Sequence, residues 1–499
     1  MSERLLHQAE WVRTEATIGL DRSSQSARGQ YFTPERAAEL IAGLPRLTEA
    51  GSLCVLDPGA GSGMLAAAVV ERACGGQRVE QVEVTAVELD SALLPALRRT
   101  AELCEEHGRR AGVRVRVKIV EGDVIALQTG LEMELGTFDL VIMNPPYKKL
   151  AATSWQRRAL DAAGWDTGNL YAAFVALGVE SLRPGGQLVA ITPRSFANGP
   201  YFEQFRKRLL RHVSFDRIHT FESRSTVFAD TGVLQENIVF AATRAGERGP
   251  VTITSSRGHT DGVSERTVAY CELVSRGDPH QFIRITTDRA DDEAVRAIVS
   301  LPASLSDLGV KVSTGRVVDF RARPNLQDAP SPDSVPLVYP GNLCGGKVLW
   351  PRPIRKPQGF RILDASDRKA LLLGGYYVLV KRFSAKEERR RIVAAVWDPS
   401  QHGERPVAFE NHLNVFHADG SGLDRELAWG LCAWLNSSVV DRCFRTFSGH
   451  TQVNATDLRS MGYPEGKDLR LLGGCLNGLP PQGDLDDLVE RMTLEPVTA

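Results

Sequence analysis

Residues 144–147, Asn-Pro-Pro-Tyr, combine groups that suit chemistry on a planar amine, and they directly follow the apolar run Phe-Asp-Leu-Val-Ile-Met. The Asn144 amide oxygen and the backbone carbonyls at Pro145 and Pro146 can accept both hydrogen bonds of an NH2 group. The lone pair of an aryl amine is delocalised, and two acceptors at its hydrogens favour the pyramidal nitrogen of a transition state. Tyr147 offers a face on which a base can stack. The segment predicts a catalytic site for an exocyclic amine.

Three acidic residues follow three successive apolar runs upstream of that segment. Asp57 precedes a turn that contains Gly59, Gly61 and Gly63, and its carboxylate favours a cationic ligand over a phosphate. Glu88 can accept hydrogen bonds from ribose hydroxyls. Asp123 can accept from an exocyclic amine such as that of adenine. Each acid taken alone is more often a turn or cap residue. The three together favour a nucleoside-like cofactor.

The elements that position these residues alternate between short apolar runs and helical stretches. The apolar runs that we interpret as strands lie within residues 53–63, 82–90, 113–123, 138–147 and 187–196. Strands separated by helices predict an α/β fold with a parallel sheet buried on both faces. Ligands of such sheets bind at the carboxyl ends of the strands, where the residues named above are expected. Further along, residues 422–444 are predicted to form one helix.

Composition narrows the class of protein. The chain has 499 residues and a formal net charge of −1, with no apolar run long enough to span a membrane. No secretory signal is evident, so a cytoplasmic protein with reduced thiols is expected. The eight cysteines form no CxxC pair and none follows a proline, which disfavours a zinc ribbon and a Pro-Cys nucleophile. We expect no metal. Residues 341–400 hold 13 basic and 5 acidic residues, which indicates either a polyanion-facing surface or a solvated face.

The motifs DPGAGSG, VELD, GD and NPPY occur in that order, after Gly-Gln-Tyr-Phe-Thr-Pro at residues 29–34. This order resembles the gamma-type, TaqI-like DNA adenine-N6 methyltransferases of restriction–modification systems, which use S-adenosylmethionine. The stretches ITPRSFANGPYFEQFR and VLQENIVF resemble PstI/BsuBI-type modification methylases in particular. The resemblance covers about residues 28–245 well and the C-terminal half only loosely.

The resemblance implies a Rossmann-like class I methyltransferase domain with a mostly parallel sheet, followed by an α+β target-recognition domain. The catalytic domain would span residues 1–245, a connecting segment and the start of the specificity region 246–335, and the DNA target-recognition domain 336–499. The residues implied to bind the cofactor are Tyr31, Thr33, Pro34, Asp57, Gly59, Gly61, Gly63, Glu88, Leu89, Asp123 and Val124. Those implied to hold the adenine are Asn144, Pro145, Pro146, Tyr147 and Phe228. An ordinary core role for Phe228 stays open.

The function implied is site-specific transfer of a methyl group from S-adenosylmethionine to N6 of a flipped adenine, without a metal. Double-stranded DNA would be the partner, a cognate restriction endonuclease would act separately, and the bacterial enzyme would be a monomer. The cations expected to contact DNA are Lys347, Arg352, Arg355, Lys381, Arg382, Arg389, Arg390 and Arg391. Two alternatives stay open: an RNA or protein-glutamine N-methyltransferase that shares the Asn-Pro-Pro-Tyr motif, and a catalytically silent DNA-binding module.

Overall fold

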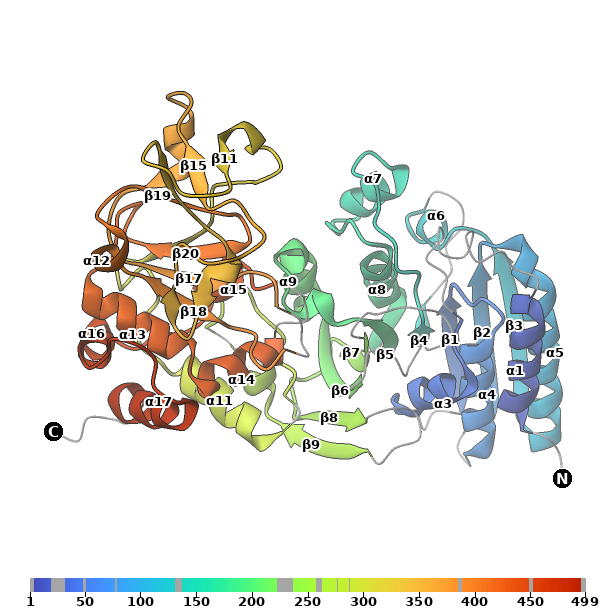
Figure 1. Cartoon of the computed structure of the whole chain (residues 1–499). Coiled ribbons are helices and arrows are strands. Elements are labelled where there is room, and N and C mark those ends of the chain that lie inside the picture. Colours follow the sequence, from blue (N-terminus) through green and yellow to red (C-terminus); the bar gives the residue numbers. More distant parts are fainter. Residues whose placement is uncertain are drawn as a thin grey trace. The chain divides into compact units, whose positions relative to one another are not determined.

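The computed structural model describes residues 4–18, 32–47, 51–76, 79–130, 137–221, 237–256, 263–275, 277–286, 288–384, 388–447 and 452–494. The chain forms two compact units, Met1–Thr287 (unit 1) and Asp288–Ala499 (unit 2). Figure 1 shows the elements of both units, and each unit is described by itself.

Unit 1 is built on a nine-stranded sheet with the strand order β3-β2-β1-β4-β5-β7-β6-β8-β9. The first five strands in that order are parallel, and β7 then pairs antiparallel with both β5 and β6. The order can be followed in Figure 1 from β3 to β7. The strands are β1 (Ser52–Pro58), β2 (Gln81–Glu88), β3 (Arg114–Glu121), β4 (Phe138–Met143), β5 (Leu182–Pro193), β6 (Val213–Phe221), β7 (Asn237–Arg244), β8 (Val251–Ser256) and β9 (Ser264–Val268).

Helices cover both faces of this sheet. One apolar core joins the sheet to α1 (Leu5–Ile18), α3 (Glu35–Gly43), α4 (Met64–Gly75) and part of α5 (Leu94–Ala111). A second core joins the other face to α6 (Val124–Gln128), α7 (Trp155–Ala162), α8 (Leu170–Ser181), α9 (Glu203–His212) and α10 (Tyr270–Leu273). Because the sheet is covered on both faces, every residue of β4 is buried, and all of them except Asp139 are apolar. The predicted Rossmann-like α/β fold with a largely parallel sheet is confirmed.

The parallel register brings the motif residues to one edge of the sheet. Asp57 pairs with Ala86 across β1 and β2, and Glu88 pairs with Glu121 across β2 and β3. The turns after β1, β2, β3 and β4 therefore leave the sheet at its carboxyl edge. The sheet itself continues past residue 245 through β8 and β9. The functional division of the chain at residues 245 and 335 stays a prediction.

Unit 2 combines two small sheets with helices. One sheet has the order β10-β20-β17-β18-β14-β13 and the other β11-β15-β12-β19-β16. Their strands are β10 (Lys311–Thr314), β11 (Leu326–Gln327), β12 (Ser334–Val338), β13 (Leu343–Cys344), β14 (Lys347–Val348), β15 (Gly359–Arg361), β16 (Leu371–Leu372), β17 (Tyr377–Lys381), β18 (Ala394–Trp397), β19 (Val407–Phe409) and β20 (Leu413–His417). The helices are α11 (Arg289–Val299), α12 (Pro399–His402), α13 (Arg425–Leu435), α14 (Ser438–Phe447), α15 (Ala455–Arg459), α16 (Gly466–Gly474) and α17 (Gln482–Val489).

The prediction of one helix over residues 422–444 is wrong, because the structure has α13 and α14 with a break at Asn436 and Ser437. The Asn436 side chain donates to the Ala394 carbonyl at 3.0 Å and accepts from the Ala394 N–H at 3.2 Å. The Asn436 side chain also donates to the Cys432 carbonyl four residues earlier, a local bond that is typical of helix ends. The break thus coincides with a tertiary contact to a residue 42 positions away.

Candidate active site

The turns after β1 to β4 enclose a cavity of about 650 Å³, which we call the strand-end cavity. Its lining includes most of the motif residues, namely Gly59, Gly61, Glu88, Leu89, Asp123, Val124, Asn144 and Pro146. It also includes Phe32 and Asp90, which belong to the motifs but were not predicted as site residues, and residues outside the motifs, among them Lys148, Lys149, Ser154, Gln156 and Phe174. Four separate turns thus contribute to one hollow at the edge of the sheet where α/β proteins bind ligands.

The glycine-rich turn forms an open floor for this cavity. The N–H groups of Gly59 and Ala60 both donate to the Val87 carbonyl, at 2.8 and 2.9 Å, which fixes the turn against β2. Gly59 has φ +75°, and a Cβ there would lie 3.2 Å from the Phe174 ring. A side chain at this position would occupy space beside the cavity. Gly63, with φ +86°, instead faces Leu97 and Thr100 of α5 and allows close helix packing.

Glu88 holds the turns after β1 and β2 together. One carboxylate oxygen accepts from the Gly61 N–H and the other from the Asp90 N–H, each at 2.7 Å. Burial raises the pKa of Glu88, although backbone N–H groups, those of Asp90 and Gly61 among them, act in the opposite direction. Next to it Leu89 is 64% exposed at the cavity, which leaves an apolar face open to a ligand.

Asp123 and Asp90 both act as caps in addition to lining the cavity. Asp123 accepts from the Ile125 N–H at 2.8 Å and begins α6, and Asp90 accepts from the Ala92 N–H at 3.2 Å. The cap role and a ligand role coexist, because a carboxylate has more acceptor positions than one backbone N–H uses. Val124 is buried immediately behind Asp123.

Asp57 is a buried acid. It is 1% exposed, and among the described residues neither carboxyl oxygen has a hydrogen-bond donor. Burial, with a smaller contribution from the negative charge of Glu88, raises the pKa of Asp57 to about 7, and the Ala66 N–H acts in the opposite direction. A carboxylate in this state gains most from a cationic ligand group nearby.

Asn144 and Tyr147 are held in place by neighbours from three segments. The Asn144 Nδ2 donates to Thr33 Oγ1 at 3.0 Å, and the Tyr147 hydroxyl lies 3.3 Å from the Ile191 carbonyl and 3.4 Å from Asn144 Oδ1. The Tyr147 ring meets the Tyr171 ring edge-on, with centroids 6.2 Å apart. The Asn144 amide therefore has a defined orientation, with its oxygen on the side of Tyr147.

Of the remaining predicted cofactor and base residues, three are described by the structure and two are not. Thr33 is buried and contacts Asn144, and Pro34 precedes α3 in extended conformation. Pro145 is buried and is not among the residues that line the cavity. Tyr31 and Phe228 lie outside the described residues. Among the residues that sequence reasoning missed, the pair Lys148-Lys149 carried a signal as two cations next to the motif, whereas Phe174 lies in an apolar helix and carried none.

The eight cations predicted to contact DNA differ in their environments within unit 2. Arg391 is 1% exposed and its guanidinium lies 5.6 Å from the Phe444 ring centroid. Arg390 donates to the Ser437 carbonyl at 2.7 Å, and burial lowers its pKa. Lys381 pairs with Glu388 at 3.0 Å. Arg352 and Arg382 each donate to a backbone carbonyl, Lys347 is half-buried, and Arg355 and Arg389 are exposed.

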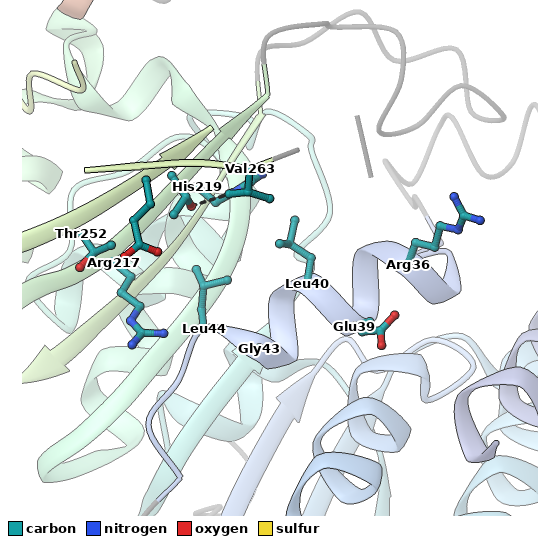
Figure 2. Close-up of a pocket in the computed structure, with 11 residues that line it drawn as sticks. Arg36, Glu39, Leu40, Gly43, Leu44, Arg217, His219, Thr252 and Val263 are labelled. Atoms are coloured by element: carbon teal, nitrogen blue, oxygen red, sulfur yellow. Dashed lines mark hydrogen bonds between the residues drawn. The ribbon is translucent and has the colours of Figure 1, made fainter. Parts of the chain in front are cut away.

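A second cavity in unit 1, of about 540 Å³, lies between α3 and the strands β6, β8 and β9, and we call it the sheet groove. Figure 2 shows Arg217, His219 and Thr252 on the strand side and Leu40, Gly43 and Leu44 on the helix side. None of the predicted site residues lines this groove.

Two global features complete the site description. No helix among the described residues is long and apolar enough to cross a membrane. Within the same residues no three His, Cys, Asp or Glu side chains gather as a metal site would require.

Comparison with known proteins connects this geometry to a family. Residues 113–228 match the model of the Eco57I restriction-modification methylase family. The type II methyltransferase M.PstI of Providencia stuartii is 38% identical over 486 residues, which are 96% of this chain and 96% of that protein. The type II methyltransferase M.BsuBI of Bacillus subtilis is 38% identical over 471 residues, or 92% of each chain.

Solved structures agree on the fold. The type IIL restriction-modification enzyme MmeI, solved in complex with DNA, superposes with a TM-score of 0.52 at 12% identity, over 99% of this chain and 74% of that chain. Because the identity to M.PstI and M.BsuBI extends over at least 92% of this chain, the chain belongs to the type II methyltransferases of restriction–modification systems, a family of S-adenosylmethionine-dependent DNA methyltransferases.

Proposed function

We propose that this chain methylates N6 of an adenine that has been flipped out of duplex DNA into the strand-end cavity. The observation that carries the proposal is the junction of two walls in one cavity. Glu88, Leu89 and Asp123 form a wall suited to a nucleoside, and Asn144 and Pro146 of the following turn form a wall suited to an aromatic amine. A donor and an acceptor of a methyl group would thus be held side by side.

The described residues fit S-adenosylmethionine as the cofactor. Asp57 is a buried carboxylate that lacks a partner, and the cofactor carries cationic groups. The positive φ of Gly59 and the lack of a Cβ leave the floor open, Leu89 offers an apolar face to a base, and Asp123 retains acceptor positions. When bound, the cofactor would supply an electrophilic methyl group on a sulfonium.

The chain's own part in the reaction is to hold and polarise the amine. Asn144 Oδ1 and the Pro145 carbonyl would accept the two N6 hydrogen bonds, which favours the pyramidal nitrogen over the planar one. The Tyr147 ring, fixed by Tyr171 and by the Ile191 carbonyl, would stack on the base. No covalent enzyme intermediate is needed, since the amine itself is the nucleophile. The N6 proton that is released would pass to solvent.

Unit 2 would recognise the DNA sequence and help to offset the cost of flipping, which is roughly a few kcal/mol. Of the predicted DNA-contacting cations, Arg355 and Arg389 are exposed and best placed to reach a phosphate or a guanine edge. The enzyme would act as a monomer, apart from a cognate endonuclease, and its substrate would place it in the bacterial cytoplasm. Relatives named as type II methyltransferases favour DNA over RNA or protein glutamine.

The deciding experiment supplies methyl-labelled S-adenosylmethionine together with duplex bacteriophage DNA, structured RNA or a protein extract in parallel reactions. Products are digested to nucleosides or amino acids and identified by mass. We expect N6-methyladenine from DNA alone. Label on cytosine N4, in RNA or on glutamine would contradict the proposal, and bound cofactor with no label in any reaction would support the silent DNA-binding module.

A further inference from the structure

The strand-end cavity is electrically divided. Glu88, Asp90 and Asp123 line it on the side of β2 and β3, where the cationic cofactor is proposed to bind. Lys148 and Lys149 line it on the other side, directly after Tyr147. Both lysines are exposed, and among the described residues neither makes an ion pair or a side-chain hydrogen bond. The two ammonium groups are therefore available to an anion at the cavity mouth.

The backbone that carries these lysines is fixed. The Lys148 carbonyl accepts from the Leu170 N–H, and the Gly168 carbonyl accepts from the Leu150 N–H, both at 2.8 Å. Lys149 forms an antiparallel bridge with Asn169, immediately before α8. The lysine side chains are long, but their backbone is held by pairing with Asn169 next to the turn that contains Asn144 and Pro146. A fixed starting point lowers the entropy that is lost when a lysine orders on a ligand.

A third source of positive potential lies on the same side of the cavity. Ser154 and Gln156, at the N-terminus of α7, belong to the cavity lining. Ser154 Oγ accepts from the Arg157 N–H at 3.3 Å, so the first turn is well formed. The N-terminus of a helix carries a partial positive charge and favours an anion nearby. Two ammonium groups and one helix terminus thus act in the same direction.

We infer that Lys148 and Lys149 bind the phosphates of the target strand that flank the flipped nucleotide. This inference rests on the proposed function, because a base held by Asn144 and Tyr147 leaves its sugar and phosphates at the cavity mouth. The positions of the lysines, one and two residues after Tyr147, favour the DNA backbone over the cofactor, which the acidic side attracts. Phosphate contacts made there hold the nucleotide in its flipped state.

The test first maps the methylated adenine with the wild-type enzyme and bacteriophage DNA, and then uses a duplex that contains this position. The variants are Lys148→Gln, Lys149→Gln, the double Gln variant and a double Arg variant. Lys118→Gln on β3 is the matched control, since Lys118 is exposed and lies outside the cavity lining. KM for DNA and kcat are measured at several KCl concentrations, cofactor affinity by calorimetry, and folding by thermal unfolding.

We expect the double Gln variant to raise KM for DNA about tenfold or more and to reduce the slope of log KM against log salt by about two, one per lost phosphate contact. The double Arg variant should restore both quantities, and the control and the cofactor affinity should not change. Weaker cofactor binding with an unchanged salt slope would overturn the inference and assign the lysines to the cofactor carboxylate. An unchanged KM would also overturn it. Failure of the proposed function is separate, because the wild type would then give no N6-methyladenine.

Discussion

The strand-end cavity and the sheet groove have similar volumes, about 650 and 540 Å³, but different polar chemistry. In the groove, polar side chains on neighbouring strands are hydrogen-bonded to each other. The two ring nitrogens of His219 lie 2.8 Å from Thr254 Oγ1 and 3.1 Å from Ser256 Oγ. Beside the strand-end cavity, buried Asp57 has no hydrogen-bond partner among the described residues, and Leu89 of the cavity lining is exposed. Volume alone therefore does not identify the site, whereas unsatisfied polar groups at converging turns do.

The largest effect that this comparison predicts is at Asn144. Asn144→Ala should lower kcat by about a hundredfold to a thousandfold, as the loss of one transition-state hydrogen-bond partner does in other enzymes. Cofactor affinity should be largely retained, because the substitution does not change Glu88, Leu89 or Asp123. Methyl incorporation and calorimetric titration of S-adenosylmethionine measure the two quantities. Equal losses in both would show that Asn144 supports the cavity as a whole.

Gly59→Ala tests whether the cavity floor is used by the cofactor. The substitution adds a Cβ 3.2 Å from Phe174 at φ +75°, so cofactor affinity should fall about tenfold or more. Gly112→Ala is the matched control, because Gly112 has φ +73° but nothing within 4 Å of an added Cβ. The control should share the backbone strain, read as a lower melting temperature, and keep the affinity. Similar affinities for both variants would refute a crowding effect at the floor.

Asp57 should make cofactor binding depend on pH. In the empty site its pKa is about 7, and a cation beside it would lower that value. Below pH 7 binding must then release a proton, so affinity should rise from pH 5 to pH 8, at most tenfold for each unit by which binding lowers the pKa. Asp57→Asn should remove this dependence.

Comparing two ligands locates the cation that Asp57 meets. S-adenosylhomocysteine keeps the ammonium group of S-adenosylmethionine and lacks the sulfonium. A pH dependence for both ligands would place the ammonium near Asp57, and a dependence for S-adenosylmethionine alone would place the sulfonium there. Affinities that do not change with pH for either ligand would remove Asp57 from cofactor binding.

The same carboxylate should lower the stability of the empty protein as pH rises. Its folded-state pKa is raised above the unfolded value of about 3.9, so the folded state binds more protons between pH 4 and 7. The stability that comes from protonated Asp57 is fully present below pH 4 and is lost as the pH rises through 7. Asp57→Asn should therefore melt at a higher temperature than the wild type at pH 8 but not at pH 4. A wild type that melts at a higher temperature than Asp57→Asn at pH 8 would contradict the raised pKa of Asp57.

The smallest effect is expected in the sheet groove. Arg217 is exposed and lines the sheet groove but not the strand-end cavity. Arg217→Ala should change kcat, KM and stability by less than about twofold or 0.5 kcal/mol, as is usual for surface positions. A loss of activity comparable to that of Asn144→Ala would mean that hydrogen-bonded polar groups around a cavity do not indicate that the cavity is unused.

The strand-end residues could be predicted from the sequence because the βαβ rhythm gives each of them a fixed place. Once strands are parallel, any residue that follows a strand lies at the same sheet edge. Asp57, Glu88, Asp123 and Asn144 needed only the chain's local pattern. Lys148 and Lys149 could not be assigned in this way, because their place depends on pairing with Asn169 and on the start of α7.

Unit 2 shows the limit of the same reasoning. Arg389, Arg390 and Arg391 form one basic run in the sequence, yet Arg389 is exposed, Arg390 is half-buried and Arg391 is buried. Their environments are set by α14, whose Asp441 and Phe444 lie about fifty positions further along the chain. Charge counts cannot detect such a partner, whereas hydrophobic periodicity and strand-end spacing do carry fold information.

The hydrogen bond from Asn144 Nδ2 to Thr33 Oγ1 has a consequence for chemical fidelity. The Asn144 amide nitrogen donates one of its two hydrogens to Thr33, and this contact turns the amide oxygen toward Tyr147. An exocyclic amine finds an acceptor there, whereas the O6 of guanine or the O4 of thymine would meet a second lone pair and gain no hydrogen bond. The orientation of the amide oxygen therefore depends on a threonine from the segment before α3, 111 positions upstream.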